Sequence, residues 1–327
     1  MKVKVIFIGT AGFAVPALRS VAGDHRVELV ITQPDRPSGR GMEPSQSPVK
    51  KEALKLDLPV FQPENINSEE SLARVSEIDP KAFVLAAYGQ KISGEFLDLV
   101  EWPVNIHGSI LPKYRGAAPI NWAVIRGEEV TGVTTIFMDE GLDSGPILLK
   151  EKTDVKENET AGELHDRLAD MGGDLILKTL TGLEEGTVEP TPQQGEPSFA
   201  PKLDREDGLI DWSRASQDVH NHIRGTYPWP GAYTYLEGEQ KIKVCRTQNL
   251  GPLQGNLLER LPLRKESKNA DAGEIIDSGS LGLVVKCGDD TAVKITGIKP
   301  SSKCEMSGTD FVNGYHIEIG DKFVKPE

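Results

Sequence analysis

Three polar side chains of this 327-residue chain could do chemistry together, namely Asn105, His107 and Asp143. The run Val104 to His107 predicts a strand, and side chains alternate along a strand, so Asn105 and His107 share one face. Gly108 follows directly, and open parallel sheets place their ligands just beyond such strand ends. Asp143 lies in a glycine-rich turn, 139–146, after a second expected strand, 133–138. Two neighbouring strand ends would therefore bring the three side chains to one cleft.

An amide, an imidazole and a carboxylate suit the attack of an amine on an activated one-carbon acyl group. The Asn105 amide and a protonated His107 can donate to the oxyanion of the tetrahedral intermediate, each donor contributing about 2.7–4 kcal/mol. Asp143 can keep His107 protonated and can take the proton of the amine, directly or through water. Taken singly, His107 fits a structural histidine and Asp143 fits a turn residue. The residue types alone thus indicate an oxyanion site with a nearby base and need no covalent nucleophile.

The elements around these residues indicate an α/β fold. Apolar runs at 4–8, 27–32, 59–62 and 82–87 alternate with helical stretches, which predicts a mainly parallel sheet in a Rossmann-like domain. Gly9 and Gly12 match part of a dinucleotide fingerprint, but a third glycine is missing, so a tight turn between strand and helix is favoured. Leu164, Leu168, Met171 and Leu175 recur at helical spacing and predict a packing helix.

The segment Gln33 to Lys50 predicts a long loop, because prolines and glycines interrupt it throughout. Arg36 and Arg40 lie among those glycines. Two arginines in such a loop favour contact with an anionic partner.

The chain length predicts two domains. We expect a catalytic domain over residues 1–189, a proline-rich linker over 190–206 and a smaller domain over 207–327. The smaller domain contains a helix near 216–224 and several short strand candidates, which favour a small β-barrel of the oligonucleotide-binding (OB-like) type. The strand candidates are 233–236, 241–245, 273–276, 281–286 and 291–298. The segment 255–271 reads as a long loop.

Charge and composition exclude several classes of protein. A net charge of −13 argues against a generic nucleic-acid binder. From Asp207 onward, however, 15 Lys and Arg face 17 Asp and Glu, so most of the acidity belongs to the first domain and the second has room for a local basic face. Three widely spaced cysteines predict neither a metal site nor disulfides, and no apolar run approaches a signal peptide or the ~18 residues of a membrane helix. We expect a soluble cytoplasmic protein.

The full pattern of motifs resembles the folate-dependent formyltransferase family. The chain contains Asn105-x-His107, then Ser-Ile-Leu-Pro-x-Tyr-Arg-Gly at 109–116, then Gly-Leu-Asp-Ser-Gly at 141–145. The resemblance extends over nearly the whole chain; further matching segments are Gly9-Thr10 with Phe13-Ala14, 32–37, 39–41, 116–120, 200–203, 210–212 and 228–231.

This resemblance implies the substrates and the roles of the residues. The formyl donor would be 10-formyltetrahydrofolate, with no metal, and the acceptor would be the α-amino group of methionine on initiator tRNA. Asn105, His107 and Asp143 match the family's catalytic positions, and its folate-binding turn matches Ser109, Ile110, Leu111 and Pro112. The family's C-terminal barrel helps to hold tRNA, and its loop arginine at the acceptor stem matches Arg40. After Gly41 the family usually continues with lysines, where this chain has Glu43. We expect the enzyme to be a monomer.

Three alternatives share parts of this pattern. A formyltransferase acting on a sugar-nucleotide amine or on glycinamide ribonucleotide would have the same catalytic trio. A related hydrolase would release formate from the same folate. A binding module could keep the fold without catalysis. The 33–50 loop and the second domain favour a large anionic acceptor, and the intact trio favours an enzyme.

Overall fold

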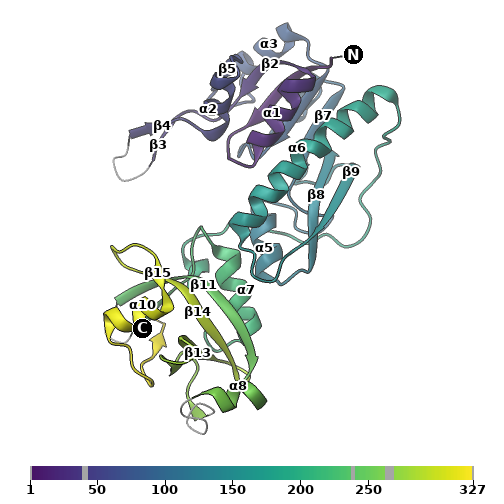
Figure 1. The fold of residues 1–327 in the computed structure, drawn as a ribbon. Coiled ribbons are helices and arrows are strands. Elements are labelled where there is room, and N and C mark those ends of the chain that lie inside the picture. The colour runs from purple at the N-terminus through teal and green to yellow at the C-terminus, as the bar shows by residue number, and fades with distance from the viewer. Residues whose placement is uncertain (1, 39–42, 237–239, 262–268, 326–327) are drawn as a thin grey trace. The chain divides into compact units, whose positions relative to one another are not determined.

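The chain folds into two compact units in a computed structural model that describes residues 2–38, 43–236, 240–261 and 269–325 (Figure 1). The first unit comprises residues 1–119, 130–154 and 165–200, and the second comprises 120–129, 155–164 and 201–327. Each unit therefore takes its residues from several stretches of the sequence.

A seven-stranded sheet in the order β5-β2-β1-β6-β7-β8-β9 forms the centre of the first unit. The strands from β5 to β7 are mutually parallel, whereas β8 is antiparallel to both β7 and β9. The mainly parallel sheet expected from the sequence is confirmed, with an antiparallel edge added. The strand bounds are β1 Lys4–Gly9, β2 Arg26–Ile31, β5 Val60–Phe61, β6 Ala82–Ala86, β7 Trp102–His107, β8 Val130–Phe137 and β9 Ile147–Asp154.

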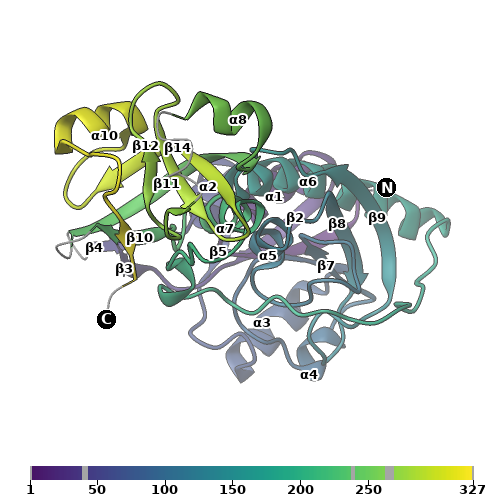
Figure 2. The same ribbon diagram turned by 90° about the horizontal axis from the view of Figure 1, so that it is seen from below.

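Helices cover both faces of this sheet, which explains why β1 and β6 are apolar along most of their length. Figure 2 shows α1 and α6 on one side of the strands and α3 and α4 on the other. The second group packs on a core that includes Ile6, Phe83 and Phe96. The helix bounds are α1 Ala14–Asp24, α2 Pro48–Lys55, α3 Glu69–Ile78, α4 Gly94–Leu97 and α6 Ala161–Glu185.

The expected long loop at 33–50 contains regular structure, so that part of the prediction is wrong. Strands β3 Arg36–Ser38 and β4 Glu43–Ser45 pair as a hairpin. Helix α2 then begins at Pro48, because the Ser47 hydroxyl accepts the Lys50 N–H at 3.0 Å and proline suits the first helical position. The many prolines of this segment gave no sequence signal for either the hairpin or the start of α2.

The second unit is built on an antiparallel, curled sheet in the form of a half-barrel. Its described strands run in the order β12-β13-β14-β11-β10-β16, with β15 beside β14. Helix α7 packs against the sheet through a core that includes Val219, Ile223 and Phe311. The bounds are α5 Pro119–Ile125, η1 Glu206–Gly208, α7 Ser216–Thr226, β10 Tyr233–Leu236, β11 Gln240–Pro252, α8 Gly255–Arg260, β12 Ile275–Asp277, β13 Leu283–Cys287, β14 Thr291–Pro300, β15 Met306–Ser307, α10 Gly308–Tyr315 and β16 Phe323–Val324.

The helix at 216–224 and four of the five strand candidates of this unit are confirmed within three residues, whereas the candidate 241–245 is only the first part of the longer strand β11, Gln240–Pro252. The expected long loop at 255–271 is partly wrong, since it begins with α8, and residues 262–268 lie outside the described part.

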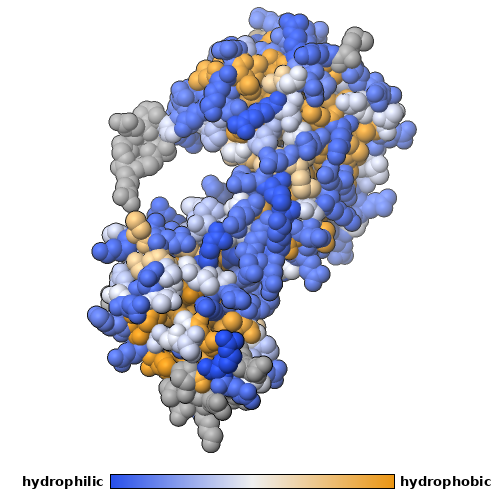
Figure 3. Space-filling view, viewed as in Figure 1, coloured by the Kyte–Doolittle hydropathy of each residue, from blue (hydrophilic) through white to orange (hydrophobic). Residues whose placement is uncertain are grey.

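The surface is mostly hydrophilic on the visible face of both units (Figure 3). The most exposed large apolar side chains among the described residues are Leu142, Phe199 and Trp229. In the part of the chain that the structure describes, no helix is long and apolar enough to cross a membrane.

Candidate active site

Strand β7 holds Asn105 and His107 on the same face of the sheet, as the alternation of side chains predicts. The intervening Ile106 lies on the other face, where α6 covers it: a Cβ built on Gly172 of that helix would lie 3.1 Å from Ile106 Cγ2. Asn105 and His107 are 7% and 5% exposed. Buried polar groups of this kind require hydrogen-bond partners.

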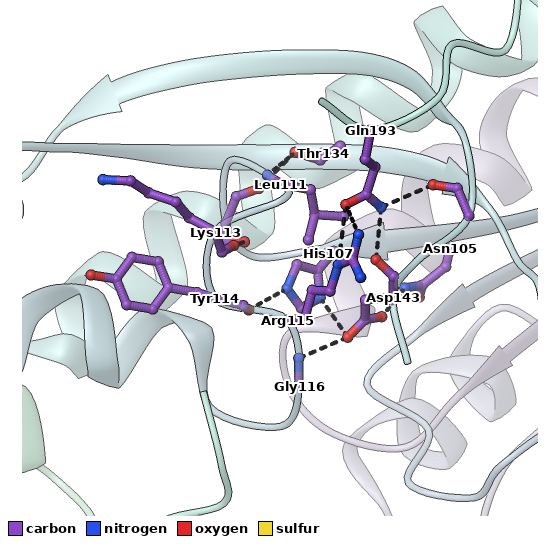
Figure 4. Close-up of polar contacts among 12 residues, drawn as sticks. Asn105, His107, Leu111, Lys113, Tyr114, Arg115, Gly116, Thr134, Asp143 and Gln193 are labelled. Carbon is purple, nitrogen blue, oxygen red and sulfur yellow. Dashed lines mark hydrogen bonds and ion pairs between the residues drawn. The ribbon is translucent and has the colours of Figure 1, made fainter. Parts of the chain in front are cut away.

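Asp143 supplies a partner to both residues (Figure 4). The Asn105 amide nitrogen donates to Asp143 Oδ1 at 3.2 Å, and His107 Nδ1 lies 3.5 Å from Asp143 Oδ2. The Gly116 N–H donates to the same Oδ2 at 2.9 Å. The structure therefore brings the predicted trio together around one carboxylate, which also accepts a backbone hydrogen bond.

The strand that precedes Asp143 runs in a different direction from the one expected. Strand β8 is antiparallel to β7 and pairs Phe137 with Val104, so its end lies beside the start of β7 and not beside His107. The loop after β8, which contains Asp143, turns back over the face of β7 that bears Asn105 and His107. The assumption of two neighbouring parallel strand ends was wrong, because alternation of side chains does not give the direction of a strand.

Backbone geometry fixes this loop. Asp143 has a φ of +48°, in the left-handed region that Asp tolerates better than most residues. A Cβ on Gly145 would lie 1.8 Å from Phe137 O, so only glycine fits there. The Asp139 carboxylate closes the turn by accepting from Ser144 Oγ at 2.9 Å and from Gly141 N at 3.1 Å. The Gly-Leu-Asp-Ser-Gly motif is thus the sequence of a tightly constrained turn.

The second loop, after β7, fixes His107. Its Nε2 lies 2.8 Å from the carbonyl oxygen of Tyr114. A carbonyl oxygen only accepts, so Nε2 carries a hydrogen and Nδ1 is the nitrogen that faces Asp143. Tyr114 itself has a φ of +62°, which is unusual for a bulky residue and occurs where surrounding contacts hold it.

A cavity of about 460 Å³ opens beside Asn105 and Asp143, a size typical of small-molecule sites. Apolar side chains form much of its wall, and the Asp143 loop forms another part. The residues that line it besides Asn105 and Asp143 are Leu85, Gly89, Gln90, Lys91, Ile92, Leu97, Gly116, Ala117, Ile136, Met138, Asp139, Glu140, Gly141 and Leu142. A flat, partly apolar ring system fits such a wall. Sequence reasoning missed the residues from Leu85 to Leu97, since an apolar run there reads only as core.

The expected folate-binding turn, Ser109 to Pro112, does not line this cavity. Ser109 and Leu111 are fully buried. The Ser109 hydroxyl donates to Lys113 O at 2.6 Å, and Lys150 Nζ donates to Leu111 O at 2.6 Å. Burial, and secondly the charge of Lys152, lowers the pKa of the Lys150 ammonium group. Leu111 belongs to an apolar cluster with Ile136, which lines the cavity, whereas Arg40 lies outside the described residues.

Gln193 is a further residue at the site that sequence reasoning missed, because it falls in the expected linker. Its amide nitrogen donates to Asp143 O at 2.7 Å and to Gly145 O at 2.9 Å. No signal in the composition of that segment separates Gln193 from its polar neighbours.

Known proteins share both the sequence and the fold of this chain. The family model "Formyl transferase" matches residues 1–180, and "Formyl transferase, C-terminal domain" matches residues 202–316. The chain is 43% identical to a methionyl-tRNA formyltransferase of Halothermothrix orenii over 97% of this chain and 99% of that protein. It is 41% identical to the same enzyme of Clostridium botulinum over 96% and 97% of the two chains. The crystal structure of WlaRD, a sugar 3N-formyl transferase, has a TM-score of 0.64 at 17% identity and covers 93% of this chain and 100% of its own, which shows a shared fold.

Proposed function

Because the chain belongs to the methionyl-tRNA formyltransferase family, which uses formyltetrahydrofolate as formyl donor, we propose that it formylates the α-amino group of methionine on initiator methionyl-tRNA for translation initiation. The formyl donor in this proposal is 10-formyltetrahydrofolate. The observation that carries the proposal is the Asp143 carboxylate, held at the cavity by Asn105, His107 and Gly116.

Asn105 is the first oxyanion donor in the proposed direct aminolysis. One hydrogen of its amide nitrogen goes to Asp143 Oδ1, and the second can donate into the cavity to the formyl oxygen as it gains charge. This donor is fixed before the reaction begins, so no reorganisation is needed when charge develops.

His107 is the second donor, acting through Nδ1. Its Nε2 hydrogen is committed to Tyr114 O, so only an Nδ1 hydrogen, 3.5 Å from Asp143 Oδ2, can be shared between the carboxylate and the oxyanion. The side chain is only 6% exposed. The proposed form of His107 therefore carries hydrogens on both nitrogens, the one on Nε2 bound to Tyr114 O and the one on Nδ1 available to the carboxylate and the oxyanion.

Asp143 is the base. A carboxylate has about four acceptor positions, and its three observed neighbours leave one for the proton of the attacking amine. As the amine nitrogen forms its bond to the formyl carbon, Asp143 accepts that proton. It then returns a proton to the folate nitrogen when the bond from that nitrogen to the formyl carbon breaks.

We assign the folate to the cavity beside the trio, with the Ser109–Pro112 turn supporting it from behind. The apolar wall and the volume of about 460 Å³ support this assignment. We propose that Arg40 contacts the acceptor stem of the tRNA.

We further propose a catalytic domain over 1–189, a linker over 190–206 whose first part, up to Ala200, packs on the first unit, and an OB-like tRNA-binding domain over 207–327 in a monomeric, cytoplasmic enzyme. The antiparallel bridge from Glu274 to Lys322 joins the regions of β12 and β16 and supports a barrel. The near balance of charges from Asp207 onward is compatible with a local basic face for tRNA.

The deciding measurement is the formation of acid-stable formylmethionyl-tRNA from 10-formyltetrahydrofolate and initiator methionyl-tRNA. We expect product with tRNA and none with an amino-sugar nucleotide. Formylation of the amino sugar without formylation of tRNA would overturn the assignment.

The Asp143→Asn variant tests the role of the base. It keeps the shape of the side chain and removes the charge, so we expect turnover to fall by at least about 100-fold while folate affinity, measured by fluorescence titration, stays within about twofold. Asp98→Asn, the same change at an exposed helix end, is the control and keeps its activity. Equal losses of turnover and affinity at Asp143 would make it a binding residue instead.

A further inference from the structure

The segment 191–200, which we call the strap, runs past both loops of the candidate site. Thr191 and Ile147 exchange backbone hydrogen bonds of 2.7 and 2.8 Å at the start of β9. The Ser198 hydroxyl accepts the Tyr114 N–H at 2.9 Å, and Ala200 N donates to Arg115 O at 2.8 Å. The strap is therefore a part of the first unit, fixed at both ends.

Gln193 joins the two loops from the middle of the strap (Figure 4). Its Nε2 donates to the carbonyl oxygens of Asp143 and Gly145, at 2.7 and 2.9 Å. Its Oε1 accepts from Arg115 Nε at 3.2 Å and from Arg115 Nη2 at 2.7 Å. Both hydrogens and both acceptor positions of the amide are used, so its orientation is determined: oxygen towards Arg115, nitrogen towards the Asp143 loop.

These contacts hold the backbone of Asp143, the proposed base. Asp143 has a left-handed φ of +48°, and Gln193 holds the carbonyl of that same residue. Gly116 and Asn105 hold its carboxylate. Backbone and side chain of Asp143 are thus fixed from opposite ends, and a strained residue keeps its conformation only where such contacts determine it.

We propose that Gln193 is a positioning residue for formyl transfer, which holds the peptide of Asp143 so that its carboxylate meets the attacking amine. This inference rests on the proposed role of Asp143 as base. The Gln193 amide is fully occupied by Arg115 and by two carbonyl oxygens of the Asp143 loop, so it acts through Asp143 and does not itself touch the substrates.

The proposal requires an amide at position 193. Two substitutions separate the contribution of the amide nitrogen from that of the amide oxygen. In Gln193→Glu the carboxylate still accepts from Arg115, but an oxygen replaces the nitrogen that faces two carbonyl oxygens. In Gln193→Ala both halves are lost. If the tie to the Asp143 loop matters, both variants fail; if the contact with Arg115 alone matters, Gln193→Glu retains activity.

The experiment measures kcat, the KM for methionyl-tRNA and the melting temperature of the full chain for each variant. We expect Gln193→Ala and Gln193→Glu to lower kcat by about 10- to 100-fold, because a small misplacement of a catalytic group has that effect. The KM for methionyl-tRNA should change by less than about twofold. Gln194→Ala, at the exposed neighbouring glutamine, is the matched control and keeps the wild-type rate.

A double variant tests whether Gln193 acts through Asp143. In single-turnover measurements with excess enzyme, we expect Gln193→Ala to slow Asp143→Asn by less than about twofold, since the base is already absent. If the double variant is slowed by the product of the two separate factors, or if Gln193→Glu is active, the positioning role is overturned. These results differ from failure of the proposed function, in which the wild-type chain itself would form no formylmethionyl-tRNA.

Discussion

At the scale of single residues, the candidate site is a set of polar groups whose hydrogen bonds fix their orientation. The Tyr114 carbonyl requires a hydrogen on His107 Nε2, which leaves Nδ1 towards Asp143. The sequence predicts His107 as an oxyanion donor without saying which nitrogen donates. The backbone carbonyl of Tyr114 determines which nitrogen faces Asp143. The role of a catalytic histidine therefore depends on the partner of its other ring nitrogen as much as on its position.

A second carboxylate, remote from the site, predicts how the first unit responds to acid. The hydrogen bond from Arg19, at 2.6 Å, lowers the pKa of Glu52 to about 2, and a bond from Lys55 adds to this. A depressed folded-state pKa gives stability that is present above the unfolded value, near 4.5, and is lost as the pH falls towards 2. We expect Glu52→Gln to melt at a lower temperature than the wild type at pH 7, with the gap closing as the pH falls from about 4.5.

Calorimetry between pH 7 and pH 3 measures this gap. Glu151→Gln, which removes a more exposed pair with Lys178, is the control and has little effect. A gap for Glu52→Gln that widens as the pH falls would contradict the assignment of the pair.

At the scale of elements, the sequence predicts those that carry a regular pattern. Strand β7 and the shared face of Asn105 and His107 follow from alternation, and the parallel strands from their apolar runs. Strand β9 is not predicted, since three consecutive charged residues, 150–152, begin its partly exposed second half at the edge of the sheet. Gln193 could not be predicted, because a side chain that binds the backbone of distant loops leaves no periodicity in the sequence.

Gly116 shows how closely the strap and the loop after β7 are fitted. Its φ is +119°, and a Cβ there would lie 2.8 Å from Ala200 O. Gly116→Ala should therefore cost about 1–3 kcal/mol of backbone strain plus the clash, and should displace the N–H that holds Asp143. We expect a lower melting temperature together with at least about a tenfold loss of kcat.

Gly195→Ala is the control for this prediction. It has a φ of +92° and no atom within 4 Å of the added Cβ, so it carries the backbone strain without the clash. Equal effects of the two substitutions on kcat would show that the fit between Gly116 and the strap is unimportant.

At the scale of the whole molecule, the second compact unit draws on the sequence of the first half of the chain. Residues 120–129 and 155–164 belong to it, together with 201–327. Arg224, which is 7% exposed, donates to the carbonyl oxygens of Lys156 and Glu159 at 3.3 and 3.0 Å. His220 contacts Glu157 O at 3.1 Å. Burial lowers the pKa of His220 and of Arg224, so both depend on these partners for compensation.

A fragment comprising residues 201–327 should therefore be much less stable than the same residues in the full chain. Without 155–164, the Arg224 guanidinium loses two carbonyl acceptors, and each hydrogen bond of a charged group contributes about 1.5–3 kcal/mol. The sum of the two is comparable to the whole stability of many small domains. Circular dichroism during heating measures the result, and we expect a broad, low-temperature transition for the fragment. Arg224→Met should narrow the gap in melting temperature between the fragment and the full chain, because it removes the charged group that has lost two of its acceptors. A fragment that melts cooperatively at the temperature of the full chain would show that the second unit needs only its own continuous sequence.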